Sequence, residues 1–283
     1  MIWITISCSA LTAHGCSSSP DDQKKNTDST DRGGSSGAAA ESGRAAGGAG
    51  RAGAAGRGAA GQVSAGSTAA FGKKYEGGEF QLGPVDWDES EWHNACAPGG
   101  AKYAPEIRAL EGDRLAGLWG GIPDVAGYCD ACIAVTTARG KSATLRVVTY
   151  GETTPNSIDV SPEAFEQLDS GEYPRAMTWQ FAACPETGPV HYEFQTGSSQ
   201  WWTSLWVRNA RLPLTKVEVK SANHAAFVEL ERGGDGTLTD GGGFGEGAFS
   251  LRLTAIDGSQ HVDQLAWPAG GIAGKMLEGS GNL

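Results

Sequence analysis

The chain has 283 residues, enough for about two domains, and it carries a formal net charge of −11. An acidic chain of this kind argues against a nucleic-acid partner, because phosphate binding needs a basic stripe that displaces counterions. No apolar run reaches the roughly 18 residues that a membrane-spanning helix needs, so no such helix is expected.

Residues 1–16 predict an exported protein. Residues 1–7 are apolar but lack the basic start of a signal peptide. The stretch that ends at Cys16, before a polar segment, resembles the cleavage box of a bacterial lipoprotein, which predicts a lipid anchor on Cys16. The alternative is a mis-called start codon, with Cys8 and Cys16 in a damaged leader. Both interpretations imply export, so we expect a secreted or cell-surface protein.

Residues 17–70 are predicted to be a disordered tether. No aromatic residue occurs between Trp3 and Phe71, and residues 33–66 contain 12 Gly and 12 Ala. Such a stretch has no large apolar side chains with which to build a core, so it samples a flexible coil. We therefore expect the folded part of the chain to begin at about Phe71.

Four cysteines remain in the foldable part: Cys96, Cys129, Cys132 and Cys184. Cys129 and Cys132 form a close pair, but no second close pair follows, so a zinc site is not expected. In an exported protein an even number of cysteines usually forms disulfides. Each member of the close pair then joins a distant partner, either as Cys96–Cys129 with Cys132–Cys184 or in the crossed pairing.

The foldable part has the pattern of an all-β protein. Short runs rich in β-branched and aromatic residues recur between turn signals, as in barrels and sandwiches. The predicted strands are residues 132–137, 145–150, 177–182, 190–195, 205–208, 215–220, 226–231, 249–254 and 262–266. Pro and Gly interrupt this pattern at residues 184–189, where we place a domain boundary.

One segment, residues 161–168, predicts a helix. Ser161 is a suitable N-cap and Pro162 is a favoured first helical residue. Asp159 precedes the helix by two residues, so the positive end of the helix favours its ionised form and a role as hydrogen-bond acceptor or base. The alternative role for Asp159 is purely local, in forming a turn.

Two adjacent indoles, Trp201 and Trp202, follow the flexible residues 197–199. On a regular strand they point to opposite faces, which places one of them in the core. A bulged backbone instead lays both rings on one surface, where their flat faces suit the apolar faces of pyranose rings. Trp206 and Val207 are assigned to the core.

Three segments resemble bacterial expansins. Residues 197–218 resemble the start of the second expansin domain, residues 158–165 resemble a segment of the first domain, and residues 75–80 resemble its first strand. The resemblance implies a six-stranded double-psi β-barrel, residues 71–187, followed by an immunoglobulin-like β-sandwich, residues 188–283. It also implies cellulose binding and loosening of plant cell walls without hydrolysis, hence a protein that is not an enzyme.

The resemblance implies roles for four residues. Asp159 matches the essential barrel aspartate, Tyr150 matches the groove tyrosine, and Trp201 and Trp202 match two of three aromatic residues that bind cellulose. We therefore expect Asp159 and Tyr150 to contact glucan hydroxyls while the Trp pair anchors the chain.

The chain departs from the expansin pattern at three positions. Val148 stands where the barrel has a second aspartate, and Ala69, beside Thr68, stands where it has a threonine. The third binding aromatic falls near Asp235, where Phe244 is the nearest candidate to replace it.

The main expectation is a monomeric, non-hydrolytic protein that binds cellulose and other wall polysaccharides, without cofactor or metal. One alternative is a weak endoglucanase or peptidoglycan lytic enzyme that uses Asp159 and Glu152. The other is a surface lipoprotein that binds carbohydrate and whose barrel is inert.

Overall fold

The computed structural model describes residues 70–85, 95–96, 105–185 and 187–283. The predicted leader and tether, with Cys16, Thr68 and Ala69, lie outside these residues apart from Ala70. The described residues all belong to one compact unit, Gln62–Leu283. Within the described part of the chain, no helix combines the length and apolar character that crossing a membrane requires.

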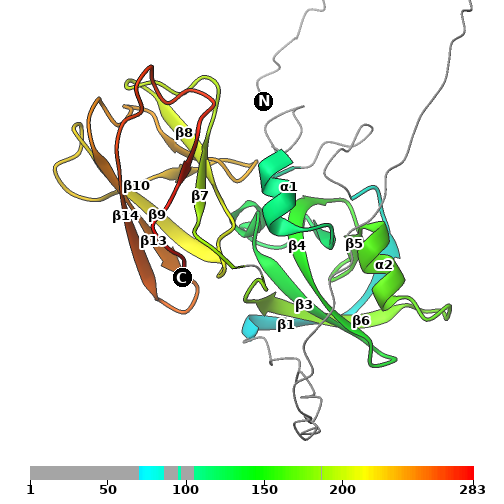
Figure 1. Cartoon of the computed structure of the whole chain (residues 1–283). Helices are drawn as coiled ribbons and strands as arrows, with labels where there is room; N and C mark the ends of the chain where they lie inside the picture. The colour runs from blue at the N-terminus through cyan, green and yellow to red at the C-terminus, as the bar shows by residue number, and fades with distance from the viewer. Residues whose placement is uncertain (1–69, 86–94, 97–104, 186) are drawn as a thin grey trace, which may run out of the picture. The chain divides into compact units, whose positions relative to one another are not determined.

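Six strands close into a barrel in the order β1-β5-β2-β4-β3-β6 (Figure 1). The strands are β1 (Ala70–Leu82), β2 (Leu115–Trp119), β3 (Cys132–Thr137), β4 (Ser142–Gly151), β5 (Ile158–Val160) and β6 (Ala176–Ala182). β1 with β5 and β2 with β4 are parallel pairs, whereas the other neighbours are antiparallel. Because the sheet closes on itself, no strand of the barrel has a free edge.

Short helices accompany the barrel. The predicted helix is confirmed as α2 (Pro162–Leu168), which contacts β4 and β1 (Figure 1). Ser161 is its N-cap, accepting a 3.4 Å hydrogen bond from the amide of Ala164. Two further helices, α1 (Pro105–Glu111) and the 3-10 helix η1 (Val125–Tyr128), were not predicted.

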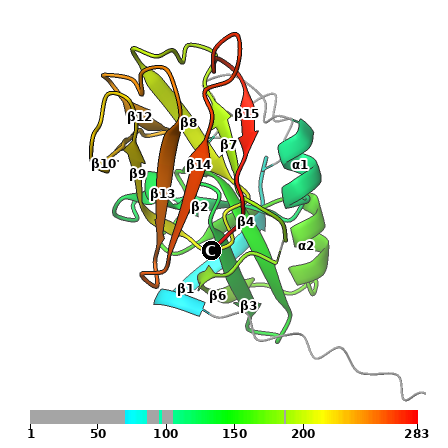
Figure 2. The same ribbon diagram turned by 60° about the vertical axis from the view of Figure 1, so that its left-hand side comes forward.

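The remaining nine strands form two sheets, ordered β10-β9-β13-β14 and β11-β12-β8-β7-β15. Figure 2 shows β13 beside β14 and β15 beside β7. The strands are β7 (His191–Phe194), β8 (Thr203–Arg208), β9 (Leu214–Lys220), β10 (Val228–Glu229), β11 (Glu231–Arg232), β12 (Leu238–Asp240), β13 (Phe249–Ala255), β14 (Gln260–Leu265) and β15 (Met276–Glu278). The apolar residues of alternating strands such as β13 face a buried core between the sheets.

The prediction of one strand over residues 226–231 is wrong. The chain instead forms β10 and β11, which belong to different sheets, and Leu230 between them is buried. The sequence did not reveal this crossing because two-residue strands are too short to show alternation. β2, β5, β12 and β15 were missed for the same reason, since none exceeds 5 residues.

The disulfides are Cys96–Cys129 and Cys132–Cys184, which is the first of the two pairings considered. Cys132 lies opposite Ala182 in the β3–β6 ladder, so Cys184 falls within reach just past the end of β6. Their Cα atoms are 5.2 Å apart. The two bridges therefore connect β3 and η1 to segments 52 and 33 residues away along the chain.

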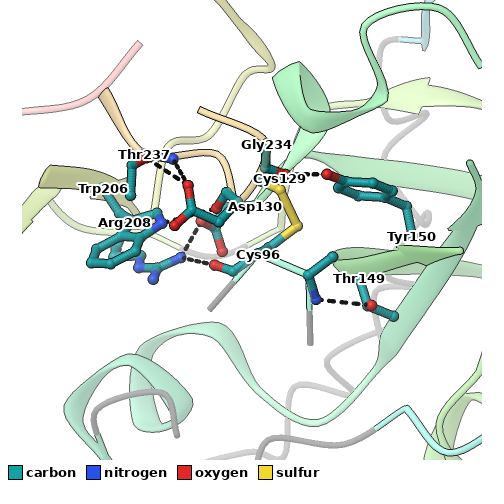
Figure 3. The surroundings of a disulfide bond; sticks show 11 residues. Cys96, Cys129, Asp130, Thr149, Tyr150, Trp206, Arg208, Gly234 and Thr237 are labelled. Atoms are coloured by element: carbon teal, nitrogen blue, oxygen red, sulfur yellow. Dashed lines mark hydrogen bonds and ion pairs between the residues drawn. A yellow bond between two sulfur atoms is a disulfide. The ribbon is translucent and has the colours of Figure 1, made fainter. Parts of the chain in front are cut away.

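A buried ion pair joins a barrel residue to a sandwich residue. The guanidinium of Arg208, on β8, contacts the carboxylate of Asp130 (Figure 3). It also lies 2.7 Å from Glu193 Oε2. It also donates to the carbonyl of Cys96 at 3.4 Å. Arg208 has no exposed surface, so water does not screen these charges.

A second guanidinium extends this network within the barrel. Arg146 donates to the carbonyl of Asp130 at 2.6 Å, and its Nε lies 3.4 Å from Glu111 Oε2. Glu111 in turn accepts a 2.6 Å hydrogen bond from the amide of Asn209, just past β8. Burial raises the pKa of Glu111 to about 7, although Arg146 opposes the shift, and burial also raises the pKa of Asp130.

Replacing Arg208 by Met is expected to lower the free energy of unfolding by about 3–5 kcal/mol, because the buried Asp130 and the half-buried Glu193 then lose their guanidinium partner. Urea denaturation followed by circular dichroism measures the loss. Lys74→Met removes an exposed pair with Glu76 and serves as the control, with an expected change below about 1 kcal/mol. Equal losses in the two variants would contradict the importance of the buried pairs.

Glu111 is expected to make stability depend on pH. Its folded pKa of about 7 lies above its ordinary value of 4.5, so the folded chain binds this proton more tightly than the unfolded chain. The stabilisation is complete below pH 4.5 and is lost as the pH rises through 7. Thermal unfolding between about pH 5 and about pH 8 should show a falling Tm. Glu111→Gln should flatten this slope, whereas the exposed control Glu163→Gln should preserve it.

Candidate functional site

Strand register places Asp159 beside Gln81, and Gly117 between Asp159 and Thr149. Asp159 on β5 lies opposite Gln81 on β1 and opposite Gly117 on β2, and Gly117 lies opposite Thr149 on β4. We call these four residues the Asp159 row. Asp159 and Thr149 are half-buried and Gln81 is exposed, so the row reaches the surface of the barrel.

Two glycines leave space around the carboxyl group. A Cβ atom on Gly117 would lie 2.9 Å from Thr149 Cγ2 and 3.6 Å from Asp159 Cβ. A Cβ atom on Gly83 would lie 2.6 Å from Asp159 Cβ. Any larger residue at either position must therefore displace a side chain of the row.

The row carries the polar groups that suit sugar hydroxyls. Gln81 Nε2 donates a 2.6 Å hydrogen bond to Asp159 Oδ1, which holds the carboxylate in one orientation. Thr149 Oγ1 accepts a 3.0 Å hydrogen bond from the amide of Ala95, so its own proton is directed elsewhere. An amide and a carboxylate thus lie on adjacent strands, and a hydroxyl lies one strand beyond Gly117.

Tyr150 connects the barrel to the sandwich. Its hydroxyl donates to the carbonyl of Gly234, in the turn between β11 and β12 (Figure 3). Partial burial raises the pKa of Tyr150, and the negative charge of Asp235 raises it further. The phenol stays protonated, and its oxygen keeps the capacity to accept a hydrogen bond.

Both indoles of the Trp pair are exposed. The chain turns tightly at residues 199–202, where the amide of Ser199 donates to the carbonyl of Trp202 at 2.7 Å. β8 begins only at Thr203, so the alternation of a strand does not apply to the pair. Trp201 is 71% exposed and Trp202 is 37% exposed.

No family model matches the chain, but individual proteins do. Expansin-YoaJ of Bacillus subtilis is 26% identical over 195 residues, which cover 69% of this chain and 74% of that protein. Expansin-like protein 6 of Dictyostelium discoideum is 28% identical over 107 residues, 36% of this chain and 37% of that protein.

Two solved structures share the fold. The apo expansin of Clavibacter michiganensis aligns with a TM-score of 0.60 and 17% identity, covering 74% of this chain and 98% of that one. A mutant of a Clavibacter michiganensis expansin, in complex with cellohexaose, aligns with a TM-score of 0.57 and 18% identity over the same shares. The resemblance to bacterial expansins is confirmed. The predicted fold class, a double-psi β-barrel followed by an immunoglobulin-like β-sandwich, is confirmed as well.

Phe244 does not supply a third binding ring in this expansin-like chain, so that prediction is wrong. Its side chain is 1% exposed and packs in the sandwich core against Phe194 and Phe249. The physical reason is that a Gly-rich loop lets Phe244 turn inward, where burial removes a large apolar surface from water. Asp235, at the expected position of that ring, uses its carboxylate to accept from Thr237.

The two other departures from the expansin pattern are at Val148 and Ala69. Val148 is the extra residue of a bulge between β2 and β4 and is fully buried in an apolar cluster with Val85, Cys96 and Leu115. The Ala69 position lies outside the described residues. Glu152 is exposed in the turn that follows β4.

Gln81 and Thr149 were not among the residues predicted from the sequence for the candidate site. The available signal was alternation: Phe80 is buried in the barrel, so its neighbour Gln81 faces the other way. Trp206, assigned to the core, is 2% exposed, but its indole N–H donates to the carbonyl of Asp235 at 3.0 Å.

Proposed function

We propose that this expansin-like chain binds cellulose and related wall glucans and loosens the wall without hydrolysis. The observation that carries the proposal is the exposure of two adjacent indoles on one tight turn. The barrel residues 71–187 and the sandwich residues 188–283 act as two domains with separate tasks. The sandwich anchors the glucan and the barrel row contacts its hydroxyls.

Aromatic stacking supports the anchoring role. An exposed indole normally costs free energy in water, and stacking on an apolar sugar face removes that cost. The expansin complex with cellohexaose gives the ligand class, an unbranched glucose polymer, for a chain of the same fold. By analogy with other aromatic pairs, each indole contributes on the order of 1 kcal/mol to binding.

The Asp159 row supports a non-hydrolytic role. Inverting glycosidases need two carboxyl groups about 6.5–9.5 Å apart, one as acid and one as base. Across the four paired residues of the row, the other members are an amide, a glycine and a hydroxyl. Asp159 therefore has no carboxyl partner in the row and is suited to accept hydrogen bonds from glucan hydroxyls.

Tyr150 takes a narrower role than the resemblance implies. Because its proton is already donated to Gly234, it contacts glucan only through its oxygen, as an acceptor from a sugar hydroxyl. Its bond to the sandwich keeps the end of β4, next to Thr149, fixed relative to the β11–β12 turn.

The site of action follows from the chemistry of the ligand. Cellulose lies outside cells, and the N-terminal residues predict export with lipidation at Cys16 as one route. We therefore propose that the chain acts as a secreted or surface-held monomer, with residues 17–70 as a tether.

Asp159→Asn is expected to abolish extension of heat-inactivated plant walls under load while leaving cellulose pull-down nearly unchanged, because the amide keeps the shape but loses the ionised acceptor. Glu163→Asn, on the exposed face of α2, is the matched control and should retain activity.

Release of reducing ends from soluble glucan or of muropeptides, lost in Asp159→Asn or Glu152→Gln, would instead support the enzyme alternative. Loss of both extension and pull-down in Asp159→Asn would contradict the division of tasks.

Trp201→Ala and Trp202→Ala are each expected to weaken cellulose binding about fivefold, and the double variant about 30-fold, since each stack is worth on the order of 1 kcal/mol. Binding isotherms on crystalline cellulose measure this. Tyr173→Ala removes another exposed ring, 77% exposed and outside the pair, and should bind normally. Unchanged binding in the double variant would refute the anchoring role.

A further inference from the structure

The backbone of Gly243 presses against the turn that carries the Trp pair. A Cβ atom on Gly243 would lie 2.3 Å from the carbonyl oxygen of Gln200 and 2.5 Å from the carbonyl carbon of Trp201. Gly243 also has a φ of +69°, a conformation that L side chains rarely adopt. Two independent constraints thus require glycine where the loop touches the turn.

The neighbours of Gly243 fasten the loop to both the core and the turn. The amide of Phe244 donates to Thr203 Oγ1 at 3.2 Å, and the amide of Gly245 donates to the carbonyl of Gln200 at 2.9 Å. The Phe244 ring is buried, with its centroid 5.2 Å from that of Phe249. The ring therefore anchors the loop, and the flanking backbone groups hold the turn.

The opposite side of the loop is held as well. Asn223 Nδ2 donates to the carbonyls of Gly243 at 2.8 Å and Gly242 at 3.2 Å. Nearby, His224 Nε2 lies 2.5 Å from Asp240 Oδ2, in the strand that leads into the loop. Residues 243–245 are thus fixed between the 221–224 turn on one side and the Trp turn on the other.

We propose that residues 243–245 are the positioning element of the Trp pair, which keeps both indoles presented to one extended glucan chain. This inference rests on the proposed function of the pair. A positioning element is needed because the free energy of an exposed indole falls when its ring folds back onto apolar surface. Phe244 occupies the core beside Thr203, and Gly243 contacts the turn. Together they hold the backbone of residues 199–202 in the conformation that exposes both indoles.

The decisive comparison is between three glycines of one loop region. Gly243→Ala introduces both the contact with the turn and the strain of a positive φ. Gly247→Ala introduces only the strain, since its φ is +112° and nothing lies within 4 Å of its Cβ position. Gly241→Ala introduces neither, because it meets no atom within 4 Å and its φ lies outside the positive range.

Cellulose binding is expected to fall about tenfold in Gly243→Ala and to stay within about twofold of the unaltered chain in the two controls. Asn223→Ala, which frees the loop without a clash, should weaken binding by a smaller factor and serves if Gly243→Ala fails to fold. Melting temperatures of all variants establish that they fold. Equal binding by Gly243→Ala, Gly241→Ala and Gly247→Ala would overturn the inference.

A spectroscopic measurement tests the positioning role separately from the proposed cellulose binding. In chains labelled with 5-fluorotryptophan, the fluorine resonances of positions 201 and 202, assigned from Trp→Phe variants, should shift in Gly243→Ala and remain in place in the controls. Shifted resonances in a chain that never binds cellulose would support positioning and refute the proposed ligand. Unshifted resonances with normal cellulose binding would refute positioning and leave the proposed function standing.

Discussion

The register of one three-residue strand is the constraint on which the barrel site depends. β5 lies between β1 and β2, parallel to one and antiparallel to the other, and Asp159 is its central residue. Since side chains alternate between faces, a slip of one residue would turn Asp159 away from Gln81 and Gly117 and bring Ile158 or Val160 to the row. Closure of the barrel on both sides of β5 prevents that slip.

The glycines of the site follow from the same constraint. Gly117 has no side chain because Thr149 and Asp159 occupy the space that a Cβ atom would enter, and Gly83 is constrained in the same way by Asp159. At both positions the close approach of a neighbouring side chain, and not only backbone freedom, requires glycine. At Gly243 the close approach of the Trp turn requires glycine for the same reason.

Buried charges and one tyrosine link the barrel to the β11-β12-β8-β7-β15 sheet of the sandwich. Arg208 reaches from β8 to Asp130, Glu111 accepts from Asn209, and Tyr150 donates to Gly234. Each contact joins residues 78 or more positions apart. In the proposed function the Trp pair and the Asp159 row act on one polymer, which requires such contacts to keep their separation constant under load.

Local signals in the sequence were enough to predict the cap of Ser161 and the strands long enough to alternate, but they left open whether one of the two indoles is buried. The sequence also narrowed the disulfides to two pairings, because an even set of cysteines in an exported chain has few options. The remaining features depend on contacts between distant parts of the chain. The pairing itself, the inward turn of Phe244, the donation of the Tyr150 proton to Gly234, and the meeting of Gln81, Thr149 and Asp159 all depend on strand neighbours far apart in the chain. Such contacts arise from register and closure, which a local pattern of residues does not encode.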